Sequence, residues 1–133
     1  MTKLKLSNPH LSNASQARQQ PDAGHFIEVD ALVDMQVTAL ALPKDIVDAL
    51  GLTPRDTRRI RRADGQVVEG PWVGGITIEI LGREMTCDAI VEAEGTTPVI
   101  GLIPLTGLDL VIDPESGDLC VNPASPDGLI INV

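Results

Sequence analysis

The chain contains almost no aromatic side chains: among 133 residues there are one Phe, Phe26, one Trp, Trp72, and no Tyr. A folded core must therefore be aliphatic, and a hydrophobic content of 43% is sufficient to fill one in a chain of this length. The same scarcity argues against a surface that stacks the bases of single-stranded nucleic acid. The composition thus predicts one small domain with an aliphatic core.

Basic residues and long apolar runs are also scarce. Ten Lys and Arg residues face 19 Asp and Glu residues, and the net charge of −9 repels phosphate backbones and anionic membranes. No segment approaches the roughly 20 apolar residues of a membrane span. Residues 1–24 are polar and lack the apolar stretch of a secretory signal. We therefore expect a flexible N-terminal tail over residues 1–24, a folded domain over residues 25–133, a cytoplasmic location, and no nucleic-acid or membrane partner.

Metal-binding side chains are few. Cys87 and Cys120 lie in separate apolar segments without a C-x-x-C partner, and His10 and His25 fall in or beside the predicted tail. The sequence shows no metal-hydrolase or phosphate-loop motif, so we expect neither a metal nor a cofactor. Two cysteines in a chain without a secretory signal are usually reduced thiols, and a disulfide between them is the alternative.

The most informative segment, from Ala31 to Pro43, is mostly apolar and carries a single carboxylate, Asp34. Burying an ionised carboxylate is costly unless it is paired or takes part in chemistry. Asp34 therefore has two interpretations. It accepts backbone hydrogen bonds in a turn, or it is a catalytic group.

Several further segments follow Asp34 in an informative order. Leu50-Gly51-Leu52 ends a short predicted helix, and the remaining segments are 61–70, Ile76-Thr77-Ile78-Glu79-Ile80-Leu81-Gly82, Val99-Ile100-Gly101 and 108–114. Their order and spacing resemble small bacterial single-domain members of the retropepsin-like aspartic protease family. Asp34 and Thr38 match the family's active-site motif, whereas Met35 and Gln36 replace its Thr and Gly. Asp109 stands where the family commonly has Gly.

The resemblance implies an all-β fold, the closed β-barrel of acid proteases, with one or two short helices. It also implies that Asp34 is catalytic and that the active-site loop is Met35, Gln36, Val37 and Thr38. In this family a water held between two carboxylates hydrolyses a peptide bond. One chain supplies one such Asp, so the resemblance implies a homodimer that acts on an extended peptide or protein substrate.

The two altered positions imply that hydrolysis is reduced or absent. The family's Gly lets the backbone turn tightly beneath the Asp and leaves room for the second carboxylate, so the side chain of Gln36 crowds the site. The family's Thr donates a hydrogen bond across the dimer, which Met35 cannot do. The alternative function is a non-catalytic β-barrel that binds or assembles through its terminal strands.

A two-residue hairpin is predicted at Asp64-Gly65, between strands over 60–63 and 66–72. By the resemblance, Ala63, Asp64, Gly65 and Gln66 form the flap that covers the substrate, and an ordinary surface hairpin is the alternative. Four arginines lie just before the turn: Arg58, Arg59, Arg61 and Arg62. On a strand they point to opposite faces, which favours a solvated strand over a patch that selects acidic substrates or a partner.

The remaining elements follow from pattern and turn residues. Strands are expected over 26–33, 37–42, 76–80, 85–91 and 118–121, with a short helix over 44–50 and a bulge or bend at Gly74-Gly75. Pro104 and Gly107 interrupt the expected C-terminal helix, so it is short or irregular. Residues 129–133 are apolar and β-branched, and they predict a terminal strand with an exposed edge.

Overall fold

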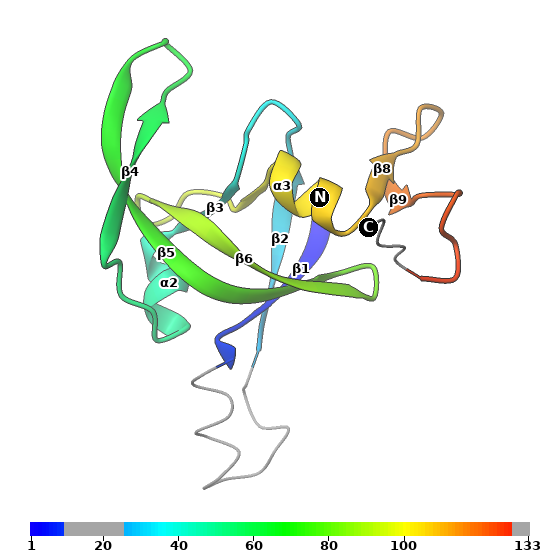
Figure 1. The fold of residues 1–133 in the computed structure, drawn as a ribbon, viewed down its shortest axis with the longest axis horizontal. Coiled ribbons are helices and arrows are strands. Elements are labelled where there is room, and N and C mark those ends of the chain that lie inside the picture. The colour runs from blue at the N-terminus through cyan, green and yellow to red at the C-terminus, as the bar shows by residue number, and fades with distance from the viewer. Residues whose placement is uncertain (10–25, 129–133) are drawn as a thin grey trace, which may run out of the picture.

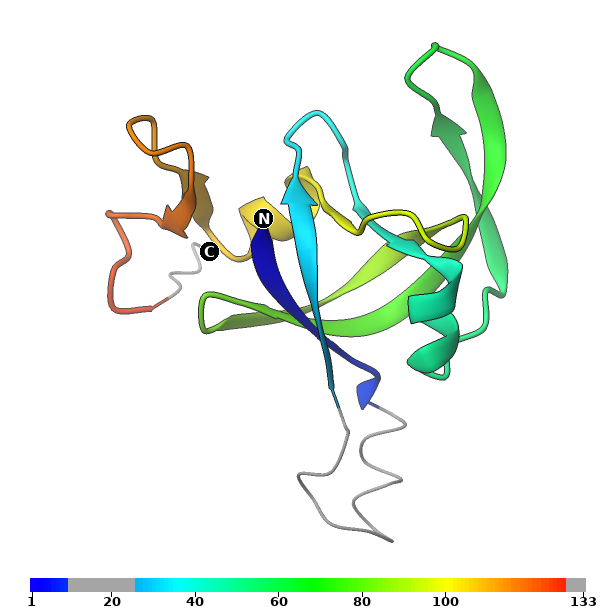
Figure 2. The same ribbon diagram turned by 180° about the vertical axis from the view of Figure 1, so that it is seen from behind.

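The structure, a computed structural model, describes residues 1–9 and 26–128 and is built mostly from β-strands (Figures 1 and 2). Six strands close a barrel in the order β1-β2-β7-β3-β6-β5, because β1 also pairs with β5, and β4 extends the sheet beyond β5. The elements are β1 (Thr2–Ser7), β2 (Ile27–Val33), β3 (Leu40–Pro43), α2 (Lys44–Ala49), β4 (Asp56–Arg61), β5 (Val67–Ile80), β6 (Arg83–Glu92), β7 (Val99–Ile100), α3 (Leu102–Gly107), β8 (Leu110–Ile112) and β9 (Leu119–Val121). The prediction of an all-β closed barrel with short helices is confirmed for the described residues.

The N-terminal strand corrects the predicted tail. Residues Thr2–Ser7 form β1, which pairs with β2 from Thr2 to Leu6 and with β5 at Lys5–Ser7, and Leu4 and Leu6 are fully buried. The prediction of a flexible tail over residues 1–24 is therefore wrong for this segment. Alternation of Lys3 and Lys5 with Leu4 and Leu6 is the period of a half-buried strand, and the polar residues that follow obscured it. Residues 10–25 lie outside the described part of the chain.

The core is aliphatic, as the composition requires. It consists of Leu, Ile, Val and Ala side chains from the barrel strands and both helices, with Cys87 at its edge. Neither aromatic residue belongs to it, since Phe26 is exposed and Trp72 is half-buried. Cys87 and Cys120 are free, and burial raises the pKa of the Cys87 thiol to about 11, so this thiol stays protonated and unreactive at neutral pH.

The predicted turns occur where glycines permit them. Gly65 (φ +88°) closes the β4–β5 hairpin, and the Gln66 N–H donates to the Asp64 carboxylate across 2.9 Å. The register of β5 against β6 shifts between Val73 and Ile76, which confirms the bulge predicted at Gly74-Gly75. Helix α2 begins after Pro43 and is followed by Gly51 in the left-handed conformation.

Helix α3 is short, as Pro104 and Gly107 predict, and the β8–β9 hairpin follows it. This hairpin is held to the barrel by the buried guanidinium of Arg83, which donates to the carbonyls of Leu108 and Asp109, both at 3.1 Å, and to the hydroxyl and carbonyl of Ser125. Asp109 accepts hydrogen bonds from Asn122 and Ser125, and these bonds hold the pKa of its carboxyl below the usual value. The predicted strand over 129–133 lies outside the described residues.

Within residues 1–9 and 26–128, no helix is both long and apolar enough to cross a membrane. The same residues contain no group of three or more His, Cys, Asp or Glu side chains placed to hold a metal ion.

Candidate active site

The Asp34 loop joins two strands that do not pair with each other. Strand β7 lies between them, parallel to β2 (Leu32 opposite Val99, Val33 opposite Ile100) and antiparallel to β3 (Ala41 opposite Val99). The Asp34 N–H donates to the carbonyl of Ile100 across 3.1 Å. The start of the loop is therefore fixed by a strand more than 60 residues later in the chain.

The end of the loop is fixed by the start of α3, at a crossing that only glycine fits. A Cβ on Gly101 would lie 2.2 Å from the Ala39 carbonyl oxygen and 2.6 Å from that of Val37. Just beyond the crossing, the Leu102 N–H donates to the Val37 carbonyl (2.7 Å) and the Ile103 N–H to that of Thr38 (2.8 Å). Backbone bonds on both sides thus hold Asp34 in one position, which a catalytic carboxylate requires.

The Asp34 side chain is exposed in the single chain, so the burial that its apolar neighbours in the sequence suggested does not occur in one copy. The apolar neighbours in the sequence belong to the barrel, whereas Asp34 lies in the turn that connects two strands. Its Oδ1 accepts the Gln36 N–H across 2.9 Å, and its carbonyl accepts the Val37 N–H across 3.1 Å. The predicted turn interaction is present, and Oδ2 accepts no hydrogen bond from a described residue.

The substituted loop residues do not distort the backbone. Leu81 and Asp109 are the non-glycine residues with positive φ in the described ranges, so Gln36 adopts an ordinary conformation. Its contact with Asp34 is made by the backbone N–H, which any residue except Pro supplies. The expectation that a tight turn needs glycine at position 36 is therefore not met in this structure. A glycine at position 36 would leave more space beside the Asp34 carboxylate.

Three large apolar side chains are exposed beside Asp34: Met35 (54%), Leu102 (41%) and Ile103 (48%). We call them the apolar rim. The hydrogen bonds of Leu102 and Ile103 to the loop place the start of α3 directly against it. Leu102 and Ile103 were not predicted as part of the site. The pattern that could have indicated them is a pair of apolar residues in a helix too short to bury both side chains. Large contiguous apolar patches on a surface are candidates for interaction sites, and the apolar rim is such a candidate.

The β4–β5 hairpin, which holds the predicted flap, projects from the same side of the barrel as the Asp34 loop (Figures 1 and 2). Ala63, Asp64, Gly65 and Gln66 are all exposed at its tip. The described structure has a pocket of about 720 Å³, which Leu32 and Val33 help to line, and another of about 620 Å³, and neither includes Asp34 or the hairpin tip. One copy of the chain therefore does not enclose Asp34 within either pocket.

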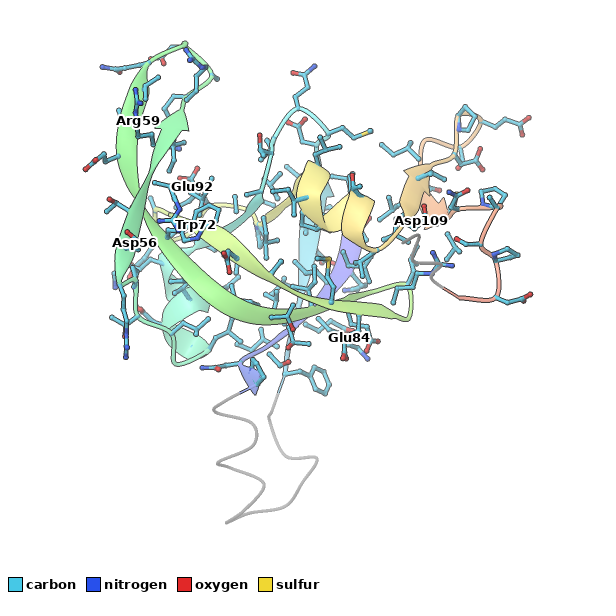
Figure 3. The ribbon with its side chains drawn as sticks, viewed as in Figure 1. Asp56, Arg59, Trp72, Glu84, Glu92 and Asp109 are labelled. Atoms are coloured by element: carbon cyan, nitrogen blue, oxygen red, sulfur yellow. The ribbon has the colours of Figure 1, made fainter. Side chains whose placement is uncertain are left out.

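The arginines of this hairpin point to opposite faces, as predicted. On one face the Arg58 guanidinium lies 5.2 Å from the centre of the Trp72 ring and pairs with Asp56, and Arg62 pairs with Glu92 at 2.9 Å. Figure 3 labels the partners Asp56, Trp72 and Glu92 on this hairpin and the adjoining strand. Arg59 and Arg61 form no ion pair with a described residue. Since two of the four charges are neutralised nearby, the hairpin is not a concentrated cationic patch.

The chain matches no protein-family model, and no curated protein matches it either.

Proposed function

We propose that this protein is a homodimeric, retropepsin-like aspartic peptidase family protein in which two copies of Asp34 face each other. The observation that carries the proposal is a carboxylate fixed by backbone bonds on both sides of its loop, exposed, and bordered by the apolar rim. A second copy related by a two-fold axis would cover the rim and bring the second carboxylate to the first. The order of sequence motifs supports the same assignment.

In such a dimer, Oδ1 of each Asp34 is held by the Gln36 N–H and Oδ2 is available to water. Two carboxylates that share one proton can use one as a base on the water and the other to protonate the carbonyl oxygen of a peptide bond. The β4–β5 hairpin would close over an extended peptide or protein substrate. The proposed setting is the cytoplasm, without a cofactor.

The proposed activity is weak, because Met35 and Gln36 replace the residues that align two carboxylates. Met35 has no hydroxyl to donate across the two-fold axis. The side chain of Gln36 occupies space beside the carboxylate. A displacement of about 1 Å at such a site lowers the rate by about a hundredfold.

The second candidate is a non-catalytic barrel that binds or assembles through the same face. The hydrogen bond from the Gln36 N–H favours it, because an Asp that closes its own turn is explained without chemistry. This candidate keeps the homodimer and the apolar rim but assigns no reaction to Asp34.

Cleavage of unfolded casein between pH 3 and 7 distinguishes the two candidates. We expect slow cleavage by the native chain and none by Asp34→Asn, since the amide cannot act as the base. Size-exclusion chromatography of both proteins controls for association, which the substitution leaves intact. Equal cleavage by the two proteins contradicts the assignment of Asp34 as catalytic, and no cleavage by the native chain contradicts the weak activity proposed for it.

A further inference from the structure

The far part of the β4–β5 hairpin is attached to the barrel by little apolar packing. Strand β5 pairs with β6 only from Trp72 onward, so Val67–Pro71 pair with β4 alone among the described strands, and this part projects as a two-stranded ribbon (Figures 1 and 2). Its one large buried side chain, Ile60, lies over Gly70 of the same hairpin and is not part of the core cluster. A two-stranded ribbon has only marginal stability by itself.

The base of the hairpin is fixed to the barrel at Trp72. The indole N–H donates to the Asp88 carboxylate of β6 across 3.3 Å, and the same carboxylate accepts the Gly75 N–H across 3.3 Å. The Arg58 guanidinium covers the Trp72 ring from the hairpin side. These contacts hold the hairpin near the β5 bulge, whereas the tip, residues 61–66, lies at the opposite end of the ribbon.

One ion pair joins this tip to the barrel. Arg62 belongs to the turn, since its N–H donates to the Gln66 carbonyl (2.8 Å) and its carbonyl accepts the Gly65 N–H (2.9 Å). Its Nη1 donates to both carboxylate oxygens of Glu92, at 2.9 and 3.0 Å. Glu92 ends β6 and lies opposite Pro43 of β3. Among the described residues, no other hydrogen bond or ion pair connects the tip with the barrel.

The strength of this ion pair suits a contact that opens and closes. The two side chains are 42% and 31% exposed, so water and salt screen their attraction. An exposed pair shifts an equilibrium between two positions by up to about fivefold. This bias is enough to favour one position of a marginally stable ribbon, and it is small enough for salt to remove it.

We propose that Arg62 and Glu92 form a latch that holds the tip of the β4–β5 hairpin in the position seen in the structure. When the pair breaks, the tip moves about the base of the hairpin, where Trp72 stays attached to β6. The latch is independent of any chemistry at Asp34. If this hairpin covers a substrate, the latch also sets how readily the hairpin opens, and that consequence alone rests on the proposed function.

The distance between the tip and the barrel tests the latch. In a Cys120→Ser background, spin labels are attached at Gln66→Cys in the turn and at Ala49→Cys, an exposed residue of α2. Labelled protein diluted in unlabelled protein gives distances within one chain by pulsed electron paramagnetic resonance. We expect one main distance at low salt. Glu92→Gln, or about 1 M NaCl, should raise the population of other distances by about twofold to fivefold.

Asp30→Asn is the matched control, because it removes the same charge from an exposed ion pair within the barrel, Lys3–Asp30 at 2.8 Å, and it should leave the distances unchanged. Reversing the latch, with Arg62→Glu and Glu92→Arg together, should restore the native distances because it restores the attraction. The proposal is overturned if Glu92→Gln leaves the distances unchanged, if Asp30→Asn changes them equally, or if the reversed pair does not restore them.

Discussion

Replacing Met35 by Thr and Gln36 by Gly should raise the rate of casein cleavage at acidic pH by at least about a hundredfold over the native chain. The Thr hydroxyl restores a donor that acts between the two loops, and Gly frees the space beside the carboxylates. The backbone accepts both changes, because Gln36 has an ordinary φ and its N–H bond to Asp34 does not need a side chain. Initial rates from pH 3 to 7 give the comparison.

The matched control is the same double variant with Asp34→Asn, which should be inactive. An Asp34-dependent increase shows that the native loop is a weakened catalytic loop. If the double variant stays dimeric and cleaves no faster than the native chain, the barrel is not built for this reaction and the assembly candidate is correct.

Arg83→Met should lower the free energy of unfolding by about 3–5 kcal/mol. The guanidinium is buried and donates hydrogen bonds to the carbonyls of Leu108 and Asp109 and to the hydroxyl and carbonyl of Ser125. Met fills similar volume but leaves these acceptors without partners in the interior, which is costly. Urea denaturation followed by circular dichroism measures the change.

Arg61→Met is the control, because Arg61 is exposed and, among the described residues, donates a single hydrogen bond, to the Gly65 carbonyl across 3.3 Å. Its effect should be within about 0.5 kcal/mol. A loss of less than about 1 kcal/mol for Arg83→Met would show that the network around Ser125 contributes little to stability.

Much of the fold follows from local sequence. Gly65 and Gly82 have positive φ in hairpin turns, Gly51 follows a helix, and Gly74-Gly75 coincide with a bulge. Glycine favours these conformations, so the turns and the bulge could be predicted from the local sequence alone. Strand β1 was missed because its alternating leucines sit before a polar stretch that resembles a tail. The closing pair between β1 and β5 is a long-range contact, which local patterns do not contain.

The candidate site was predicted less completely. The position of Asp34 between two barrel strands was predictable from its apolar neighbours, but its exposure was not, because an apolar run does not show which residue lies in the connecting turn. Gly101 was recognised as part of a motif. The reason that glycine is needed there is the close approach of the Ala39 and Val37 carbonyls, which only the three-dimensional structure shows. The role that we propose for the apolar rim involves a second copy of the chain, which the sequence of one chain does not show.

The central claim is that the Asp34 loops of two copies meet at a two-fold axis, and cross-linking through position 35 tests it most directly. In a Cys120→Ser background, which removes the half-buried thiol and leaves the buried Cys87, Met35→Cys should form a disulfide-linked dimer nearly completely under mild oxidation. Val67→Cys, at an exposed site on the β4–β5 hairpin, should form little. Non-reducing electrophoresis gives the result, and a yield for Met35→Cys no higher than that for Val67→Cys would contradict the account.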